Sequence, residues 1–249
     1  MLLFKDIDKF PKPQNGCVVT IGKFDGVHLG HQLIFDQLKS QAVKLDSASL
    51  VIVIEPHPEE FFARHNGRQL IRLNTIREKL ELLETVGVDF VYQFNFDETT
   101  SEINAESYIK DILVDGLGIR GIIIGDDFRF GKNRIGNYSL LEEYGEKYDY
   151  QVFKTAAYER NGHRISSTFV REQLLGSNFD LVTQVLGRPY SITGKVLRGQ
   201  QLGATLGFPT CNVDPGLNRI PLRGVFACEV KLGGLNFKAA VNLGYRPTV

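Results

Sequence analysis

Short β-rich runs alternate with helical stretches through the first part of this chain, and this order restricts the folds open to it. Parallel strands joined by crossover helices give this pattern. The β-rich runs are Cys17–Gly22, Leu50–Glu55, Val88–Phe94, Gly121–Gly125 and Gln151–Thr155. The helical stretches are Leu29–Leu45, Ile76–Val86, Ala105–Leu113, Leu140–Lys147 and Thr168–Leu175. Capping boxes are expected at Thr75 with Glu78 and at Ser139 with Glu142. The first part is therefore predicted to be a doubly wound α/β domain built on a parallel sheet.

The pattern changes near residue 188. A short helix, Asn178–Leu186, is expected to bridge into strand-like runs joined by glycine-rich segments such as Gly199–Gly207. The strand-like runs are Tyr190–Arg198, Val225–Leu232 and Leu235–Leu243. These features predict a small β-barrel or sandwich and two domains, residues 1–186 and 187–249. An open sheet would leave unpaired edges, so we expect the second domain to be incomplete in this chain.

Composition excludes several classes of protein. The 29 basic and 29 acidic residues balance, whereas a protein that grips a nucleic-acid backbone usually has a basic excess. The longest apolar run, Leu50–Ile54, is far too short to span a bilayer, and no signal peptide precedes it, so a cytoplasmic protein is expected. Cys17, Cys211 and Cys228 lack paired spacing, so neither a disulfide framework nor a zinc site is expected.

The segment GKFDGVHLGHQLI, Gly22–Ile34, carries the chain from a predicted strand into a predicted helix. His28 and His31 are three residues apart and would share one helix face. Gly30 between them lacks a Cβ, so a nucleotide can approach the backbone closely. The helix start adds free N–H groups and a positive dipole end. We predict a site for a triphosphate whose charge grows in the transition state. Two surface histidines on a helix are the plain alternative.

A second loop, GDDFRFGKNRIGN, follows the predicted strand that ends at Gly125. It places charged residues among glycines, and it contains two aromatic residues that can either stack on a flat ring or pack in the core. The charged residues are Asp126, Asp127, Arg129 and Lys132, and the aromatic ones are Phe128 and Phe130. A solvated charged turn is the alternative to a ligand-binding loop.

The segment RISSTFVR, Arg164–Arg171, begins another predicted helix. Ser166, Ser167 and Thr168 would cap its N-terminus, and Arg171 would lie on the same face as Thr168. Hydroxyl groups, helix N–H groups and a guanidinium can together hold a leaving pyrophosphate. Helix capping alone would also explain the hydroxyl groups.

Two further segments carry polar residues with a chemical interpretation. IEPHPEEFF ends a strand and opens a short helix with Pro58 early in it, so His57 can face a ligand at the end of the strand or be structural. In GFPTCN, Thr210 and Asn212 offer the short oxygen ligands that suit a hydrated Mg²⁺.

Four of these segments, in this order, resemble the motifs of bacterial bifunctional riboflavin kinase/FAD synthetases. GKFDGVHLGH resembles their HxGH motif, and GDDFRFGKNRIGN resembles their second nucleotide and flavin loop. RISSTFVR resembles ISSTxxR, the counterpart of KMSKS in class I aminoacyl-tRNA synthetases. GATLGFPTCN is similar to the kinase motif GxPTxN, with Cys211 as a mild departure from PTAN. The resemblance covers nearly the whole chain.

This resemblance implies an HxGH nucleotidyltransferase domain over residues 1–186 and a partial riboflavin kinase β-barrel over 187–249. It implies transfer of AMP from ATP to FMN, giving FAD and pyrophosphate, with Mg²⁺ accompanying ATP. It also implies that the parent protein phosphorylates riboflavin to FMN. The catalytic carboxylate of the kinase would lie downstream of VNLGYRPTV, Val241–Val249, so we expect kinase activity to be impaired in this chain.

The roles follow the matched motifs. His28, His31 and Arg171 are expected to be catalytic. The residues expected to bind ATP and its phosphates are Gly22, Phe24, Gly26, Gly30, Gly125, Asp127, Ser166, Ser167 and Thr168. Those expected to bind flavin are His57, Phe128, Arg129 and Asn137. Thr210 and Asn212 are expected to hold the Mg²⁺ of the kinase site.

Three alternatives remain at this point. Another HxGH adenylyltransferase, acting on a pantetheine or a nicotinamide mononucleotide, would not need the GFPTCN half. A class I synthetase fragment would need a basic surface for tRNA. A non-catalytic flavin carrier would have no need of His28, His31 and Arg171.

Overall fold

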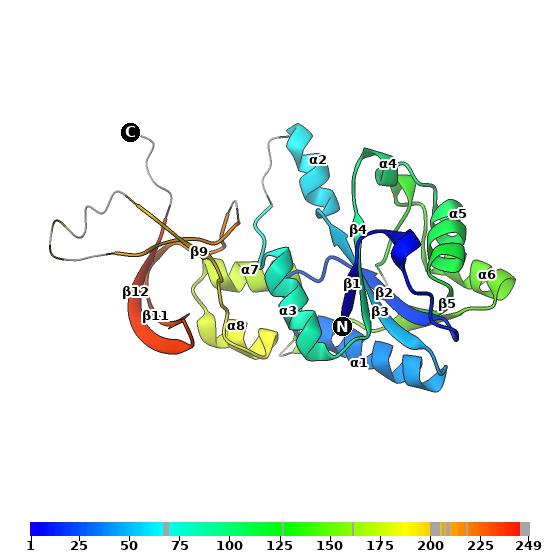
Figure 1. Ribbon diagram of the computed structural model, residues 1–249, viewed down its shortest axis with the longest axis horizontal. Coiled ribbons are helices and arrows are strands. Elements are labelled where there is room, and N and C mark those ends of the chain that lie inside the picture. Colours follow the sequence, from blue (N-terminus) through cyan, green and yellow to red (C-terminus); the bar gives the residue numbers. More distant parts are fainter. Residues whose placement is uncertain are drawn as a thin grey trace.

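A sheet of six parallel strands forms the centre of the first part of the molecule (Figure 1). The computed structural model describes residues 1–66, 70–125, 127–160, 162–199, 205, 207, 210–217 and 219–244. The strand order is β1-β4-β3-β2-β5-β6. The strands are β1 (Leu2–Phe4), β2 (Cys17–Gly22), β3 (Ala48–Glu55), β4 (Phe90–Asn95), β5 (Ile119–Gly125) and β6 (Gln151–Thr155). The predicted doubly wound α/β fold is confirmed.

Helices cover both faces of this sheet because its strands alternate two sets of apolar side chains. Cys17, Val19 and Ile21 of β2 join one buried cluster, and Val18 joins the other. The first cluster includes a short α5 (Ala105–Ser107), which continues as a π-helix over Tyr108–Gly116, and α6 (Tyr138–Tyr148). The second includes α1 (Leu29–Lys44) and α3 (Ile76–Val86).

The strand order creates a switch point between β2 and β5. From β2 the chain moves outward through β3 to β4, then returns to place β5 on the other side of β2. Connections leaving the carboxyl ends of β2 and β5 therefore diverge, which opens a crevice where open α/β sheets bind ligands. The segments of the first 186 residues that were expected to bind ligand either follow strands of this sheet or, in the case of RISSTFVR, lead into α7 (Ser167–Leu175).

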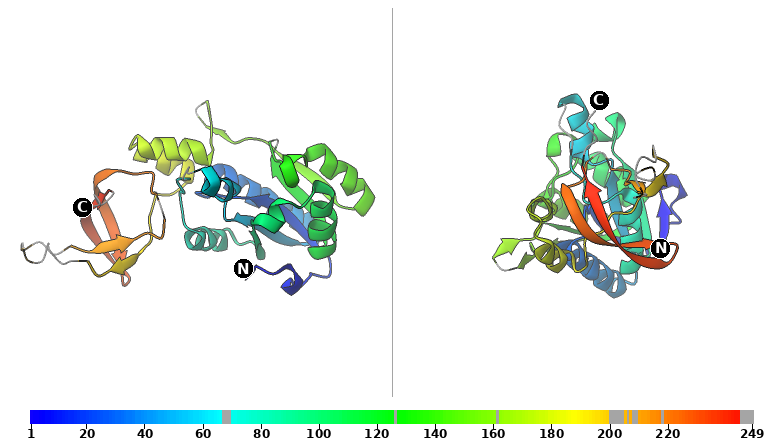
Figure 2. Two further views of the ribbon diagram at one scale, coloured as in Figure 1. Left: turned by 90° about the horizontal axis from the view of Figure 1, so that it is seen from above. Right: turned by 90° about the vertical axis from the view of Figure 1, so that its left-hand side faces the viewer.

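A third apolar cluster lies apart from the two sheet faces. It joins α7 (Ser167–Leu175) and α8 (Phe179–Leu186) to Leu73 and Ile165. Figure 1 shows these two helices between the parallel sheet and the C-terminal strands, and the left view of Figure 2 shows the same placement. The α7–α8 pair thus connects the two parts of the chain.

The C-terminal part is built of antiparallel strands, as its pattern predicts. β9 (Lys195–Leu197) pairs with β10 (Asn212–Asp214), and β11 (Gly224–Leu232) pairs with β12 (Leu235–Leu243). The turn between β11 and β12 uses Gly233 and Gly234, both with positive φ. Much of the expected glycine-rich loop, including residues 200–204, lies outside the described residues.

Several local expectations need correction. Asn137, not Ser139, caps α6: its Oδ1 accepts the Leu140 N–H at 3.0 Å, and Ser139 is already inside the helix. The expected helix at Ala105–Leu113 is mostly the π-helix. Strand β1 was not predicted, because three residues show no periodicity; it pairs with β4 at the sheet edge. The capping box of Thr75 and Glu78 is confirmed. Within the described ranges, no helix is long and apolar enough to cross a membrane.

Candidate active site

The loop between β2 and α1 turns sharply through residues with positive φ. Phe24, Gly26 and Val27 have φ of 48°, 82° and 42°. A Cβ on Gly26 would lie 2.6 Å from Leu73 Cδ1, so both the backbone angle and the close contact require glycine there. Phe24 is buried, with its ring against those of Phe35 and His31. A Cβ on Gly22 would press on the Phe24 ring, at 3.0 Å.

His28 and His31 lie together at the start of α1. Their rings stack with centroids 3.6 Å apart and an angle of 19° between the planes. His28 is the N-cap residue and not part of the helix: its Nδ1 accepts the His31 backbone N–H at 3.3 Å. A Cβ on Gly30 would lie 3.1 Å from His28 Nδ1. Gly30 therefore gives room to the imidazole as well as to any ligand.

Both imidazoles are neutral at pH 7. Burial, together with the positive charges of Arg188 and Arg171, lowers the pKa of His28 to about 4. Burial, with His28 and Lys79 nearby, also holds the pKa of His31 well below its ordinary value. Since Nδ1 of His28 accepts a hydrogen bond, Nε2 carries the proton and is a donor. The pair can donate hydrogen bonds to phosphate oxygens.

Asp25 connects this loop to α7. Its buried carboxylate forms an ion pair with Arg171 and accepts the Leu73 N–H at 3.1 and 3.2 Å. The Asp25 carbonyl accepts a hydrogen bond from Ser167 Oγ at 2.8 Å. Arg171 Nε also donates to the Ile71 carbonyl. The HxGH-like loop and the RISSTFVR segment, far apart in sequence, are thus held together by the carboxylate and the carbonyl of Asp25.

The other hydroxyl groups of RISSTFVR have different places. Ser166 is the N-cap of α7, and its Oγ accepts the Phe169 N–H at 3.1 Å. Thr168 is exposed. Arg164 forms an ion pair with exposed Asp127 at 3.0 Å, so the loop after β5 also reaches this segment. Gly125 is the last residue of β5, and Asp126 lies outside the described residues.

A buried cluster of charges lies beneath the end of β3. Lys79 is fully buried, with Nζ 3.4 Å from His57 Nε2 and 3.8 Å from Glu55 Oε2. Burial lowers the pKa of Lys79 to about 8, and burial with the Lys79 charge lowers that of His57 to about 2. Arg72 bridges Glu55 and Glu60. His57 is therefore a neutral, enclosed residue and does not line the cavity described next.

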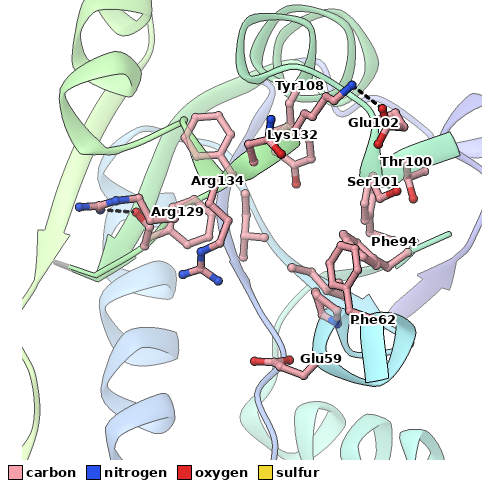
Figure 3. A pocket seen from close by; sticks show the side chains of 18 of the residues that line it. Glu59, Phe62, Phe94, Thr100, Ser101, Glu102, Tyr108, Arg129, Lys132 and Arg134 are labelled. Carbon is pink, nitrogen blue, oxygen red and sulfur yellow. Dashed lines mark hydrogen bonds and ion pairs between the residues drawn. The ribbon is translucent and has the colours of Figure 1, made fainter. Parts of the chain in front are cut away.

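A cavity of about 810 Å³ opens at the same edge of the sheet (Figure 3). Its apolar wall contains six aromatic side chains: Phe62, Phe94, Phe96, Tyr108, Phe128 and Phe130. Its charged residues are Glu59, Glu102, Arg129, Lys132 and Arg134. In Figure 3, Arg129 and Arg134 lie across the cavity from Phe62 and Phe94. The volume and the aromatic wall suit a flat ring system.

The structure brings only part of the predicted flavin set to this cavity. Phe128 and Arg129 line it, whereas His57 and Asn137 do not. Asn137 uses its side-chain oxygen to cap α6. In the C-terminal part, Thr210 and Asn212 are exposed, and Phe208 and Pro209 between the glycine loop and Thr210 lie outside the described residues.

Sequence reasoning missed three residues that organise the site: Asp25, Lys79 and Arg188. Asp25 lies within the GKFDGVHLGH motif, but the sequence does not show that its partner is Arg171. Lys79 lies in a helix where a lysine usually faces water. Arg188 donates to the carbonyls of Gly26 and Val27 and lies outside every motif that was singled out.

Comparison with known proteins gives a consistent result. The family model described as FAD synthetase matches residues 10–169, and the one described as riboflavin kinase matches residues 186–249. The bifunctional riboflavin kinase/FMN adenylyltransferase of Escherichia coli K12 is 41% identical over 95% of this chain and 75% of its own length. That of Pseudomonas fluorescens is 39% identical over 100% of this chain and 79% of its own length.

One solved structure extends the agreement in fold. The crystal structure titled as a macrolide-efflux protein from Streptococcus pneumoniae superposes with a TM-score of 0.80. It covers 98% of this chain and 78% of that one at 24% identity, which supports the fold alone. The motif order, the paired histidines at the sheet edge, the two matched families and these sequence identities lead to one conclusion: the chain belongs to the bifunctional riboflavin kinase/FMN adenylyltransferase family.

Proposed function

We propose that this chain transfers the adenylyl group of ATP to the phosphate of FMN, giving FAD and pyrophosphate. The observation that carries the proposal is the meeting of His28, His31 and the start of α7 at the edge of the sheet that also holds the aromatic cavity. Membership of the family supports the choice of flavin over pantetheine or nicotinamide mononucleotide.

The reaction needs no covalent intermediate. A phosphate oxygen of FMN forms a bond to the α-phosphorus of ATP. The bond from that phosphorus to the α,β-bridging oxygen breaks, and pyrophosphate leaves with the electron pair. Catalysis then consists mainly of alignment and of stabilising the charge that spreads over the phosphorus oxygens.

Each group of residues has a proposed part in this step. His28 Nε2–H and the neighbouring His31 donate to oxygens on the α-phosphorus. Arg171, oriented by Asp25, uses its remaining N–H groups on the departing pyrophosphate, together with Ser167 and Thr168 at the start of α7. The glycines of the loop allow the triphosphate to approach the backbone. The neutrality of both imidazoles avoids the cost of burying two adjacent cations.

The cavity is the proposed flavin site. Phe128 and Arg129 line it and are proposed to contact the ring and its polar edge. His57, enclosed under β3, and Asn137, which caps α6, are proposed to shape the surroundings of the ligands and not to touch the flavin.

Mg²⁺ fits this chemistry as a companion of ATP. In the part of the chain that the structure describes, no three His, Cys, Asp or Glu residues gather into a metal cage. An ion held largely by phosphate oxygens and water does not need such a cage. In the C-terminal part, the exposed side chains of Thr210 and Asn212 are proposed to hold a second Mg²⁺, that of the kinase site. The ion would neutralise phosphate charge.

The test uses ATP analogues that block different bonds. The protein, FMN and Mg²⁺ are incubated with ATP, with its α,β-methylene analogue or with its β,γ-methylene analogue, and FAD is measured by chromatography. ATP and the β,γ analogue should give FAD, because the α,β bond remains cleavable in both. The α,β analogue should give none. A folded protein that binds FMN yet forms no FAD from ATP would instead be a flavin carrier.

We propose further that the parent protein phosphorylates riboflavin to FMN, and that a polypeptide of residues 1–249 does so poorly. Family membership supports the first statement. The second rests on the resemblance, which implies a catalytic carboxylate downstream of Val241–Val249. Loss of general-base catalysis costs typically 10²–10⁴ in rate. Riboflavin replaces FMN in the test. Robust phosphorylation by residues 1–249 would show that another residue serves as the base.

A further inference from the structure

Arg188 lies in one matched family region and makes its contacts in the other. It follows α8 directly, after Gly187, and falls within the riboflavin kinase match of residues 186–249. Its guanidinium, however, donates to the loop between β2 and α1, inside the FAD synthetase match of residues 10–169. The side chain is partly buried, and its cation donates to three backbone carbonyls.

The guanidinium is part of a closed set of hydrogen bonds. One terminal nitrogen of Arg188 donates to the Gly26 carbonyl at 2.7 Å. The other donates to the carbonyls of Val27 at 3.1 Å and Leu186 at 3.2 Å. Gln32 Nε2 donates to the same two carbonyls, each at 3.0 Å. Two carbonyls are therefore shared by two donors, which fixes the loop, α1 and the end of α8 together.

This set of bonds acts on the peptide units that lead into His28. The Val27 carbonyl belongs to the peptide bond between Val27 and His28, so holding that oxygen fixes the plane from which the His28 side chain departs. Gly26 and Val27 both have positive φ, a conformation that a valine adopts only when its surroundings impose it. Arg188 supplies that constraint from outside the loop.

Residues that follow Arg188 also form hydrogen bonds with segments around the His28 site. The Tyr190 hydroxyl donates to the Leu73 carbonyl at 2.9 Å, and Leu73 in turn donates to Asp25. The Thr193 N–H donates to one carboxylate oxygen of Glu78 at 2.6 Å. The other oxygen of Glu78 completes the capping box of α3. The segment from Arg188 to Thr193 is thus hydrogen-bonded to the residues that surround the proposed nucleotide site.

We propose that Arg188 is a positioning residue for adenylyl transfer, which holds the Gly26–Val27 turn so that His28 is aimed at the α-phosphate. The inference rests on the proposed function of the His28 site. It also means that part of the adenylyl-transfer machinery lies in the region matched by the riboflavin kinase model.

The first experiment compares Arg188→Lys and Arg188→Ala with the wild-type protein in FAD formation. Lysine keeps the charge but lacks the planar fork that reaches three carbonyls. Both variants should lower kcat about tenfold to ~10², with KM for ATP nearly unchanged, because misplacement of a catalytic group by about an ångström has that effect. Arg198 is an exposed arginine ten residues further along the chain, and Arg198→Ala is the matched control that should keep wild-type kinetics.

The second experiment is a double-mutant cycle with His28→Asn. If Arg188 acts through His28, Arg188→Lys should change the residual rate of His28→Asn less than about twofold. Circular dichroism at the assay temperature confirms that each variant is folded. A wild-type rate for Arg188→Lys, or a full additional loss in the His28→Asn background, would overturn the proposal. Absence of FAD from the wild-type protein would instead count against the proposed function.

Discussion

The sequence locates the two histidines at the start of α1, but their protonation state depends on burial in the folded protein. The spacing of His28 and His31 predicts that their side chains meet, and they do, as stacked rings. Spacing says nothing of their protonation, which depends on enclosure and on Arg188 and Arg171 nearby. It also does not reveal that His28 is a helix cap. Nδ1 of His28 caps the helix, and Nε2 of the same ring is the proposed donor to phosphate.

This double use allows the two contributions to be separated. Asparagine is a good N-cap, so His28→Asn should keep the hydrogen bond to the His31 N–H while losing the imidazole N–H. We expect kcat for FAD formation to fall by ~10² or more, with melting temperature close to that of the wild type. His28→Ala should lose both rate and stability. Steady-state kinetics and thermal denaturation of the two variants check this, and a His28→Asn rate near the wild type would remove His28 from the chemistry.

The Asp25–Arg171 pair predicts an asymmetric effect on stability. Arg171→Ala leaves a buried carboxylate without its cation, which typically costs ~3–5 kcal/mol. Asp25→Asn together with Arg171→Ala removes the uncompensated charge and should restore part of that loss. The free energy of unfolding, measured with urea for both variants, tests this. If the double variant were less stable than Arg171→Ala alone, other groups would be stabilising the negative charge of Asp25 in the absence of Arg171.

At the scale of elements, periodicity predicts most of the first part of the chain. The bounds of β2, α3 and β6 agree with the runs identified from sequence. The failures have local causes. A three-residue edge strand has no pattern, and a π-helix has no distinctive sequence. At α6, both Asn137 and Ser139 are good caps, and only the geometry of the preceding loop decides between them.

The cap of α6 can be tested by a matched pair of substitutions. Asn137→Ala removes the acceptor of the Leu140 N–H and should lower the free energy of unfolding by ~1 kcal/mol. Ser139→Ala lies inside the helix and should change it little or raise it slightly. Denaturant unfolding of the ligand-free protein makes the comparison. Equal losses at the two positions would show that the cap is shared.

At the scale of the whole molecule, the order of strands explains why scattered motifs meet. Once the alternation of strands and helices predicts a parallel sheet, the loops after β2, β3 and β5 must lie along one edge. The partner of each side chain is beyond such reasoning. Asp25 and Arg171 are 146 positions apart, and the cavity is lined from several connections whose paths depend on packing.

Burial of neutral histidines predicts how the stability of the whole fold depends on pH. The pKa values of His28, His31 and His57 are lowered in the folded state, so below pH 6.5 the unfolded chain binds more protons. Stability should therefore fall as pH is lowered from 7 to 5, by up to ~1.4 kcal/mol per pH unit for each histidine kept neutral. Urea unfolding across this range measures the slope. His28→Asn should reduce the slope by up to the contribution of one proton. An unchanged slope would contradict the lowered pKa of His28.

The separate packing of α7 and α8 affects the order in which parts of the molecule unfold. The third apolar cluster is smaller than the two that flank the sheet, and its helices supply Arg171 and Ser167. Regions with their own small core open as sub-global units at lower free energy than the whole. Undocking of this pair would separate Arg171 from Asp25 while the sheet remained folded. Amide hydrogen exchange should therefore be faster in α7 and α8 than in β2 and β3, and enzymatic competence should disappear at milder denaturation than the sheet itself.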